Sequence, residues 1–304
     1  MGYRRPQMTA RILDAIRAAE PSELFLVMDG PKPDNWEDQR AVEATRAVVE
    51  AIDWDARVHR IFADKNMGLK ARVSSGLDQV FERTERAIIL EDDCLPSADF
   101  FRFTTELLDR YADKESVGLI SGSSRLRGRS VSDSSYDFSA DVRIWGWATW
   151  ARTWQGFSGS GDLENQWSPD EREALVAQFP TGARRKAMRS MLSGAGNLDS
   201  WALPFVAHCV GKGLLNPVPA RNLVTNIGLG ASSTHTRFES WVAYQDFESL
   251  DFPLVHPPEV AVNPHLDALE SSLDARELWA YPLRHPVDAL QRVLRYLWLM
   301  VTSR

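Results

Sequence analysis

Hydrophobic and polar residues alternate with two periods along the first 125 positions. Short apolar runs bounded by polar residues or glycine are typical of buried strands. Apolar residues spaced three and four positions apart are typical of helices that pack by one face. The pattern predicts strands at 23–30, 57–62, 87–90 and 117–122, and helices at 6–20, 40–52, 69–84 and 98–111. Because strands recur roughly every thirty residues, the length of a βαβ unit, a mostly parallel sheet flanked by helices is expected.

The pattern changes after residue 130. Serine, aspartate and glycine become common, and four tryptophans gather in 145-WGWATWARTW-154. Helices are predicted at 184–192 and 198–212, and short strands and turns at 214–230. From about residue 250 proline is frequent, and the pattern closes with a helix at 289-ALQRVLRYLWLMVTSR-304. That last helix either lies on a membrane surface through its apolar and arginine-bearing faces or docks on the core.

Composition narrows the class of protein. A chain of 304 residues with a net charge of −7 lacks the basic character of a general nucleic-acid binder. Cys94 and Cys209 are its two cysteines, too few for a disulfide scaffold or a cysteine-built zinc site. No secretory signal or spanning run is visible. A cytoplasmic location is therefore expected, with peripheral membrane contact through the last helix as an addition.

In the stretch 86-RAIILEDDCLPS-97, an apolar run predicted to be a strand is followed directly by three carboxylates, Glu91, Asp92 and Asp93. Ligands of open α/β sheets bind outside the carboxyl ends of the strands. Adjacent like charges repel unless a cation joins them, and Mg²⁺ or Mn²⁺ prefers carboxylate oxygens. The alternative is a strand end followed by a helix whose first turn favours acidic residues.

A polar turn, 64-DKNMGLKAR-72, follows one predicted strand and opens a helix. Backbone N–H groups at a helix start favour anions, and Lys65, Lys70 and Arg72 add positive charge. The turn is either a diphosphate contact or a solvated basic turn.

Three further features have both a functional and a structural interpretation. The 11 tryptophans either line a sugar site or fill the core. Asp199, in 197-NLDSWA-202, is either a general base or a helix N-cap. His235, in 231-ASSTHTR-237, is either a metal ligand or a structural or exposed histidine.

The fingerprints of dinucleotide-binding, P-loop and α/β-hydrolase proteins are absent from the sequence. The chain instead resembles nucleotide-sugar-dependent glycosyltransferases of the GT-A fold. It is similar to a bacterial family described as hemolytic or sugar-transferase-like and, more distantly, to the N-acetylglucosaminyltransferase I family, which has a Glu-Asp-Asp form of the Asp-x-Asp signature. The matching segments are 66-NMGLKARVSSGLDQVFE-82, 88-IILEDDCLPSADFFRF-103, 145-WGWATWARTW-154 and 221-RNLVTNIGLGASSTHT-236.

The resemblance implies a domain over residues 1–245, with a nucleotide-sugar half (1–125) and an acceptor half (126–245), followed by an extension (246–304). It implies an inverting transfer to a hydroxyl of a glycan or lipid-linked acceptor, with a UDP-sugar as the expected donor and Mn²⁺ or Mg²⁺ as cofactor. Asp93 and His235 would bind the metal, and Asp199 would be the base. The implied substrate-binding residues are Gly2, Tyr3, Arg4, Asp29, Asn66, Gly68, Arg72, Asp92, Trp145, Gly146 and Trp147.

The chain departs from the family at its start. Family members usually have an apolar strand before the segment that corresponds to 2-GYRRP-6. Either that strand is missing ahead of Met1 or the sheet is completed differently. Two other functions stay open: a metal-dependent nucleotide-sugar hydrolase and a non-catalytic sugar-binding protein.

Overall fold

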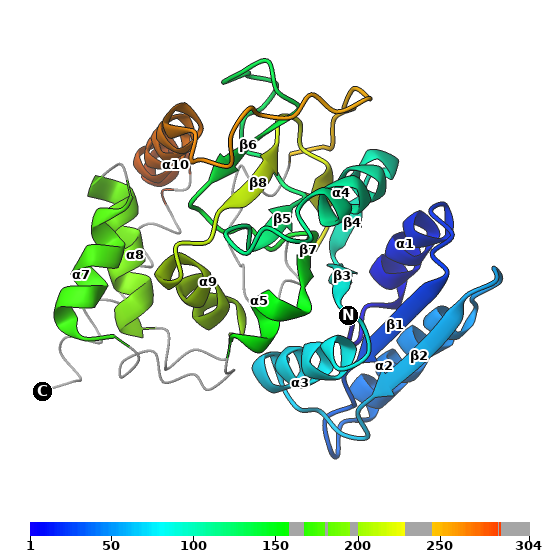
Figure 1. The fold of residues 1–304 in the computed structure, drawn as a ribbon. Coiled ribbons are helices and arrows are strands. Elements are labelled where there is room, and N and C mark those ends of the chain that lie inside the picture. Colours follow the sequence, from blue (N-terminus) through cyan, green and yellow to red (C-terminus); the bar gives the residue numbers. More distant parts are fainter. Residues whose placement is uncertain (158–166, 180–181, 195–199, 229–244, 285, 287–304) are drawn as a thin grey trace, which may run out of the picture.

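The computed structural model describes residues 1–157, 167–179, 182–194, 200–228 and 245–284, together with residue 286. These residues form a mixed α/β structure (Figure 1). The predicted class is thus confirmed at this coarse level. The predicted catalytic Asp199 and metal ligand His235 lie outside the described residues, as does the whole of the predicted last helix, 289–304.

The first part of the chain forms one parallel strand pair with helices packed around it (Figure 1). Its elements are α1 (Pro6–Arg17), β1 (Glu23–Met28), α2 (Trp36–Glu50), β2 (Arg57–Phe62) and α3 (Leu69–Phe81). Local signals set the helix starts: Pro6 stands in the first turn of α1, and the Asn35 side chain accepts a hydrogen bond from the Asp38 N–H of α2. All five elements were predicted, with boundaries shifted by a few residues.

The central sheet has three strands, β3 (Arg86–Ile89), β7 (Trp147–Trp150) and β5 (Leu119–Ser121), in the order β3–β7–β5. Both outer strands run antiparallel to β7. Two further antiparallel pairs join β4 (Cys94–Pro96) to β9 (Val224–Asn226) and β6 (Tyr136–Ser139) to β8 (Asn216–Pro219). The prediction of a mostly parallel sheet is therefore wrong for the named strands, since only β1 and β2 form a parallel pair.

The first two residues lie between β1 and the carboxyl end of β3 (Figure 1). Gly2 pairs with Met28 in parallel, donating its N–H to Val27 at 3.0 Å and accepting the N–H of Asp29 at 3.0 Å. The Met1 ammonium donates to the Leu90 carbonyl at 2.7 Å. The start of the chain thus connects the parallel pair with the central sheet.

The helices α4 (Ala98–Arg110) and α5 (Ala151–Gln155) pack against the central sheet, and α9 (Ala202–Gly211) reaches it through the contact of Phe205 with Trp147. The helices α7 (Pro169–Ala177) and α8 (Gly182–Gly194) pack on each other, and α8 also contacts α9. α4 buries Phe100, Phe103 and Leu107 completely. Near α5 and α9, Trp147 stacks on Trp201 with ring centroids 5.8 Å apart.

The sequence pattern missed α10 (Pro264–Arg284). This helix docks through Leu266, which is completely buried, and through buried polar contacts: Glu270 is ion-paired with Arg143, and Asp267 accepts a hydrogen bond from Ser139. Hydrophobic periodicity does not detect such a helix. Within the described ranges, no helix has the length and apolar character needed to cross a membrane.

Candidate functional site

The three carboxylates lie on the turn between β3 and β4, closed by a hydrogen bond from the Cys94 N–H to the Glu91 carbonyl at 3.1 Å. We call residues 91–93 the acidic turn. One nitrogen of Arg5, Nη1, donates to both Asp92 at 3.1 Å and Asp93 at 2.9 Å. The Tyr3 N–H also donates to Asp92, at 3.3 Å. The acidic turn is thus bound by residues from the very start of the chain.

Burial disfavours the charged forms of two carboxylates of the acidic turn. Burial and then the charge of Asp93 raise the pKa of Glu91 to about 8, against the opposing effect of the Met1 ammonium. Burial also raises the pKa of Asp92, although Arg5 opposes the shift. A group of this kind gains stability from an added cation.

The donor set fits a hard divalent cation in an open site. No three His, Cys, Asp or Glu side chains in the described part of the chain are arranged to enclose a metal ion. Mg²⁺ sites are, however, commonly built from one or two carboxylates, with substrate phosphates and water as the other ligands. Asp93, with Asp92 beside it, matches that pattern provided that Arg5 shares or leaves the carboxylates.

The segment after β9 packs directly against Asp93. Asn226 pairs with Cys94, and the Ile227 N–H donates to the Asp93 carbonyl at 2.8 Å. A Cβ atom on Gly228 would lie 2.5 Å from both Cβ and Oδ2 of Asp93. Only glycine therefore fits at this position without a shift of the carboxylate. The matching segment 221–236 thus reaches the acidic turn, and its described part ends there.

The predicted residues Asp29 and Asn66 are brought together at the end of β1. Asp29 is buried, and its Oδ1 accepts the N–H groups of Gly30 at 2.8 Å and Met67 at 2.9 Å. Its Oδ2 accepts the Asn66 amide at 2.8 Å. Gly68, with φ of 81°, then begins α3 without a side-chain cap. Asp29 therefore fixes the polar turn 64–72 beside β1.

Arg72 lies one turn into α3 and is only 6% exposed. Its Nη1 contacts the Met67 sulfur at 3.7 Å, whereas Nε and Nη2 have no hydrogen-bond partner in the described part of the chain. Burial lowers its pKa, with the charge of Asp29 opposing the shift. A buried guanidinium with unused donors next to a helix start is suited to an oxyanion.

Tyr3 and Arg4 have other partners than predicted. The Tyr3 hydroxyl donates to Asp38 at 2.5 Å, and Arg4 Nη1 donates to the same carboxylate at 2.9 Å. Asp38 is fully buried and also accepts the Lys32 N–H at 2.7 Å. These two side chains therefore anchor the chain start to α2. Half of the Arg4 side chain stays exposed (51%), and the Tyr3 main chain does contact the acidic turn.

The three consecutive residues predicted to bind substrate, Trp145, Gly146 and Trp147, have different surroundings in the structure. Trp147 is completely buried against Trp201 and Phe205, which argues against direct contact with a sugar and corrects that prediction. Trp145 is half-buried. Gly146 has φ of +60°, and a Cβ atom there would lie 2.6 Å from Val224 of β9. Gly146 thus supports β9 rather than a ligand.

Sequence reasoning missed Arg5, Asp38 and Gly228. The segment 2-GYRRP-6 does signal a basic chain start, but it does not say which arginine faces the carboxylates. The start of α1 at Pro6 settles this by turning Arg5 toward the acidic turn and Arg4 toward α2. Asp38 lies in the first turn of α2, ahead of the predicted helix at 40–52.

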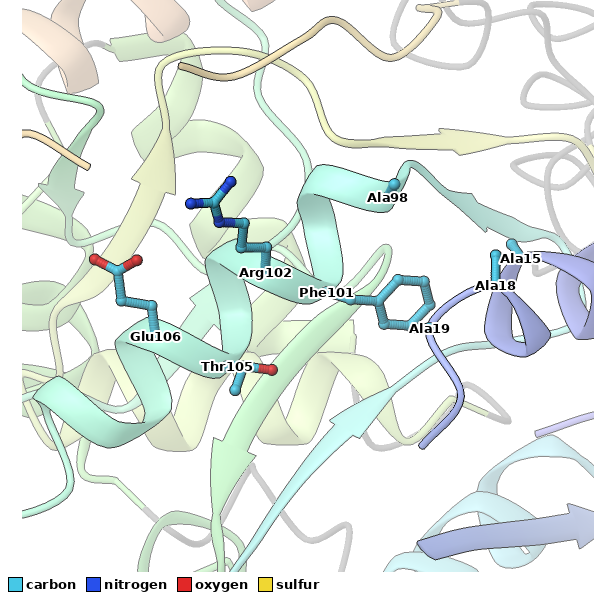
Figure 2. Close-up of a pocket in the computed structure, with 8 residues that line it drawn as sticks. All are labelled: Ala15, Ala18, Ala19, Ala98, Phe101, Arg102, Thr105 and Glu106. Carbon is cyan, nitrogen blue, oxygen red and sulfur yellow. The ribbon is translucent and has the colours of Figure 1, made fainter. Parts of the chain in front are cut away.

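A cavity of about 460 Å³ lies elsewhere, between the end of α1 and the start of α4 (Figure 2). Its walls are mainly alanine side chains, and the ring of Phe101 points from α4 toward α1. Only Arg102 and Glu106 bring charge to it, and it shares no residue with the acidic turn. We therefore place the candidate site at the acidic turn.

No protein-family model matches this sequence, and a search of curated proteins finds no match to it.

Proposed function

We propose that this chain is a metal-dependent glycosyltransferase of the GT-A type, which moves a sugar from a nucleotide-sugar donor to a hydroxyl acceptor. Its coarse fold is mixed α/β, and its sequence segments resemble that class. Cell-surface glycan or polysaccharide synthesis is the process to which such an activity belongs.

The proposal rests on two groups of opposite charge: the acidic turn, whose carboxylates bind Arg5, and the buried Arg72 guanidinium, two of whose nitrogens have no hydrogen-bond partner among the described residues. A bound cation would stabilise the charged form of the acidic turn, and a bound anion would accept hydrogen bonds from Arg72. Gly2 lies between Asp92 and Asp29, because a Cβ atom on Gly2 would lie 3.5 Å from the Cβ of Asp92 while its carbonyl accepts the Asp29 N–H. A metal-bound nucleoside diphosphate supplies both charges in one ligand.

Each residue then has a role in binding. Asp93 would hold Mn²⁺ or Mg²⁺, which when bound stabilises negative charge on the leaving diphosphate. Arg72 and the start of α3 would bind phosphate oxygens. Asp29 and Asn66 would keep the turn 64–72 in position beside the nucleotide. Asp199 remains the proposed base that takes the acceptor proton, in an inverting transfer.

A thermal-shift panel tests the proposal. Nucleoside diphosphates and nucleotide sugars are each tested with Mn²⁺ and with chelator, because a ligand that binds only the folded chain raises the unfolding temperature. A UDP-sugar is expected to raise it only with Mn²⁺, and Asp93→Ala should remove the effect. Asp109→Ala, which changes an exposed carboxylate paired with Arg86, is the matched control.

The outcomes separate the competing functions. Sugar release that needs no acceptor would indicate a hydrolase. Binding that persists in Asp93→Ala and in chelator would indicate a non-catalytic binding protein. No shift with any nucleotide would contradict the proposed function.

A further inference from the structure

Arg5 connects the acidic turn to α1 through a side chain whose backbone is fixed. It is the N-cap residue of α1, and its carbonyl accepts the Thr9 N–H at 2.9 Å while Pro6 occupies the first helical turn. The backbone therefore has little freedom. The Arg5 side chain keeps 23% of its surface exposed, so the guanidinium has a route toward solvent.

The Arg5 guanidinium occupies the position that a metal on Asp93 would need. Its Nη1 lies 2.9 Å from Asp93 Oδ2, and the backbone of Gly228 closes the carboxylate from another direction. The Cys94 thiol lies 3.5 Å from the other oxygen, Oδ1. A divalent cation and the Arg5 guanidinium thus compete for one carboxylate, because like charges this close repel strongly.

We propose that Arg5 is an internal counter-cation that closes the acidic turn to a metal ion arriving alone, and that it moves to the diphosphate when metal and nucleotide arrive together. This proposal rests on the proposed function, since it concerns the same metal and nucleotide. The guanidinium then exchanges two carboxylate oxygens for phosphate oxygens, which arginine also binds strongly. No bond is made or broken in the step.

Coupled binding follows from this exchange. Metal alone must displace Arg5 without giving it a new anion, so its affinity is reduced. Metal with a diphosphate gives Arg5 a partner, so each ligand should strengthen the binding of the other by the same factor. The site would then discriminate against free metal ions and against nucleotides without metal.

The test measures Mn²⁺ binding to the full chain, with and without uridine diphosphate. The electron paramagnetic resonance signal of free Mn²⁺ reports how much of the ion is bound. Arg5→Gln should bind Mn²⁺ alone about tenfold more tightly than the wild type, and the coupling between Mn²⁺ and uridine diphosphate should fall about tenfold. Arg5→Lys keeps a cation and should bind Mn²⁺ alone more like the wild type. Arg17→Gln is the matched control, because Arg17 also bridges two aspartates, Asp14 and Asp53, but at the exposed end of α1.

Arg5→Gln should strengthen the binding of Mn²⁺ alone and weaken the coupling between Mn²⁺ and uridine diphosphate. A purely structural role would not produce this combination, since a misfolded variant binds both Mn²⁺ and uridine diphosphate more weakly. Mn²⁺ affinity that is unchanged or reduced in Arg5→Gln would overturn the Arg5 proposal while leaving the proposed function in place. Equal gains in Arg5→Gln and Arg5→Lys would also overturn it, because the charge would then not matter. Absence of Mn²⁺ binding in every variant, with and without uridine diphosphate, would overturn both proposals.

Discussion

At the scale of single residues, the burial of Arg72 carries a cost to the fold that a bound anion would offset. Its guanidinium is buried, two of its three nitrogens have no hydrogen-bond partner in the described part of the chain, and its first contact is a thioether. Burying an incompletely paired charge destabilises a protein. Residues kept at such a cost are typical of functional sites.

Arg72→Met should therefore change stability and binding in opposite directions. The free energy of unfolding should rise by about 1–2 kcal/mol, because a buried charge is replaced by an apolar side chain of similar length. The Mn²⁺-dependent nucleotide shift should be lost. Urea unfolding measures the first effect and thermal shift the second. Arg83→Met, which changes an exposed arginine just after α3, should alter neither. A destabilised Arg72→Met protein would show that Arg72 is structural.

Gly228→Ala tests how closely the segment after β9 must approach Asp93. The added Cβ atom would lie 2.5 Å from the carboxylate, so the carboxylate or the backbone must move. We expect a destabilisation of about 1–3 kcal/mol, the usual effect of overpacking, and loss of the Mn²⁺-dependent shift. Gly182→Ala is the control, since a Cβ there meets nothing within 4 Å. Unchanged metal binding in Gly228→Ala would place the metal away from Asp93.

The sequence predicted the site only in part at this scale. The acidic turn was singled out because it follows a strand end, where side chains of an α/β protein converge. Asp29 and Asn66 were named through the resemblance to glycosyltransferases. Arg5 was not singled out, because its contact with Asp93 spans 88 residues. Trp147 was misassigned, since tryptophans that fill a core and tryptophans that line a site have the same sequence pattern.

At the scale of elements, hydrophobic periodicity predicted most helices and strands of the first half but not how the strands pair. The run 86–90 reads equally well beside a parallel or an antiparallel neighbour, and β7 takes the antiparallel place between β3 and β5. Besides their apolar contacts, α8 and α10 are each attached by an ion pair to the loop after β6, Arg184 with Asp141 and Glu270 with Arg143. Charge pairs across long separations leave no periodic signal, which explains why α10 was missed.

The attachment of α8 gives a pH prediction. Burial opposes the charged form of Asp141, but Arg184 of α8 together with Arg125 and Arg143 outweighs it and holds the pKa at about 2. The pKa in the unfolded chain is about 3.9, so the ionised carboxylate contributes roughly 2–3 kcal/mol of stability above about pH 5. Because the folded pKa is depressed, this contribution is lost as the pH falls through 4 toward about 2.

Urea unfolding between pH 2.5 and 7 checks this prediction in the wild type and Asp141→Asn. The difference in unfolding free energy between the two should be largest above pH 5 and should shrink as the pH falls. Asp109→Asn, at an exposed ion pair, should show a small difference at every pH. A constant gap for Asp141→Asn would mean that packing, rather than charge, attaches α8.

At the scale of the whole molecule, the site draws on four stretches that are distant in sequence. They are the chain start, the turn 64–72, the acidic turn and the segment 224–228. Gly2 pairs with Met28 of β1, and the Ile227 N–H donates to the Asp93 carbonyl, so the chain start and the segment after β9 bring the parallel pair and the acidic turn together. Sequence alone cannot give this meeting, since it depends on which elements pair.

A ligand that binds all four stretches should stabilise them as one unit. With Mn²⁺ and uridine diphosphate, amide hydrogen exchange should slow together in 1–5, 66–72, 92–96 and 224–228, because local opening of any stretch would break a contact to the ligand. α7 and α8 share no residue with the site and serve as an internal control. Asp93→Ala should abolish the protection in all four stretches. Protection confined to 66–72 would instead mean that Arg72 binds phosphate without the acidic turn, and it would separate the anion site from the metal site.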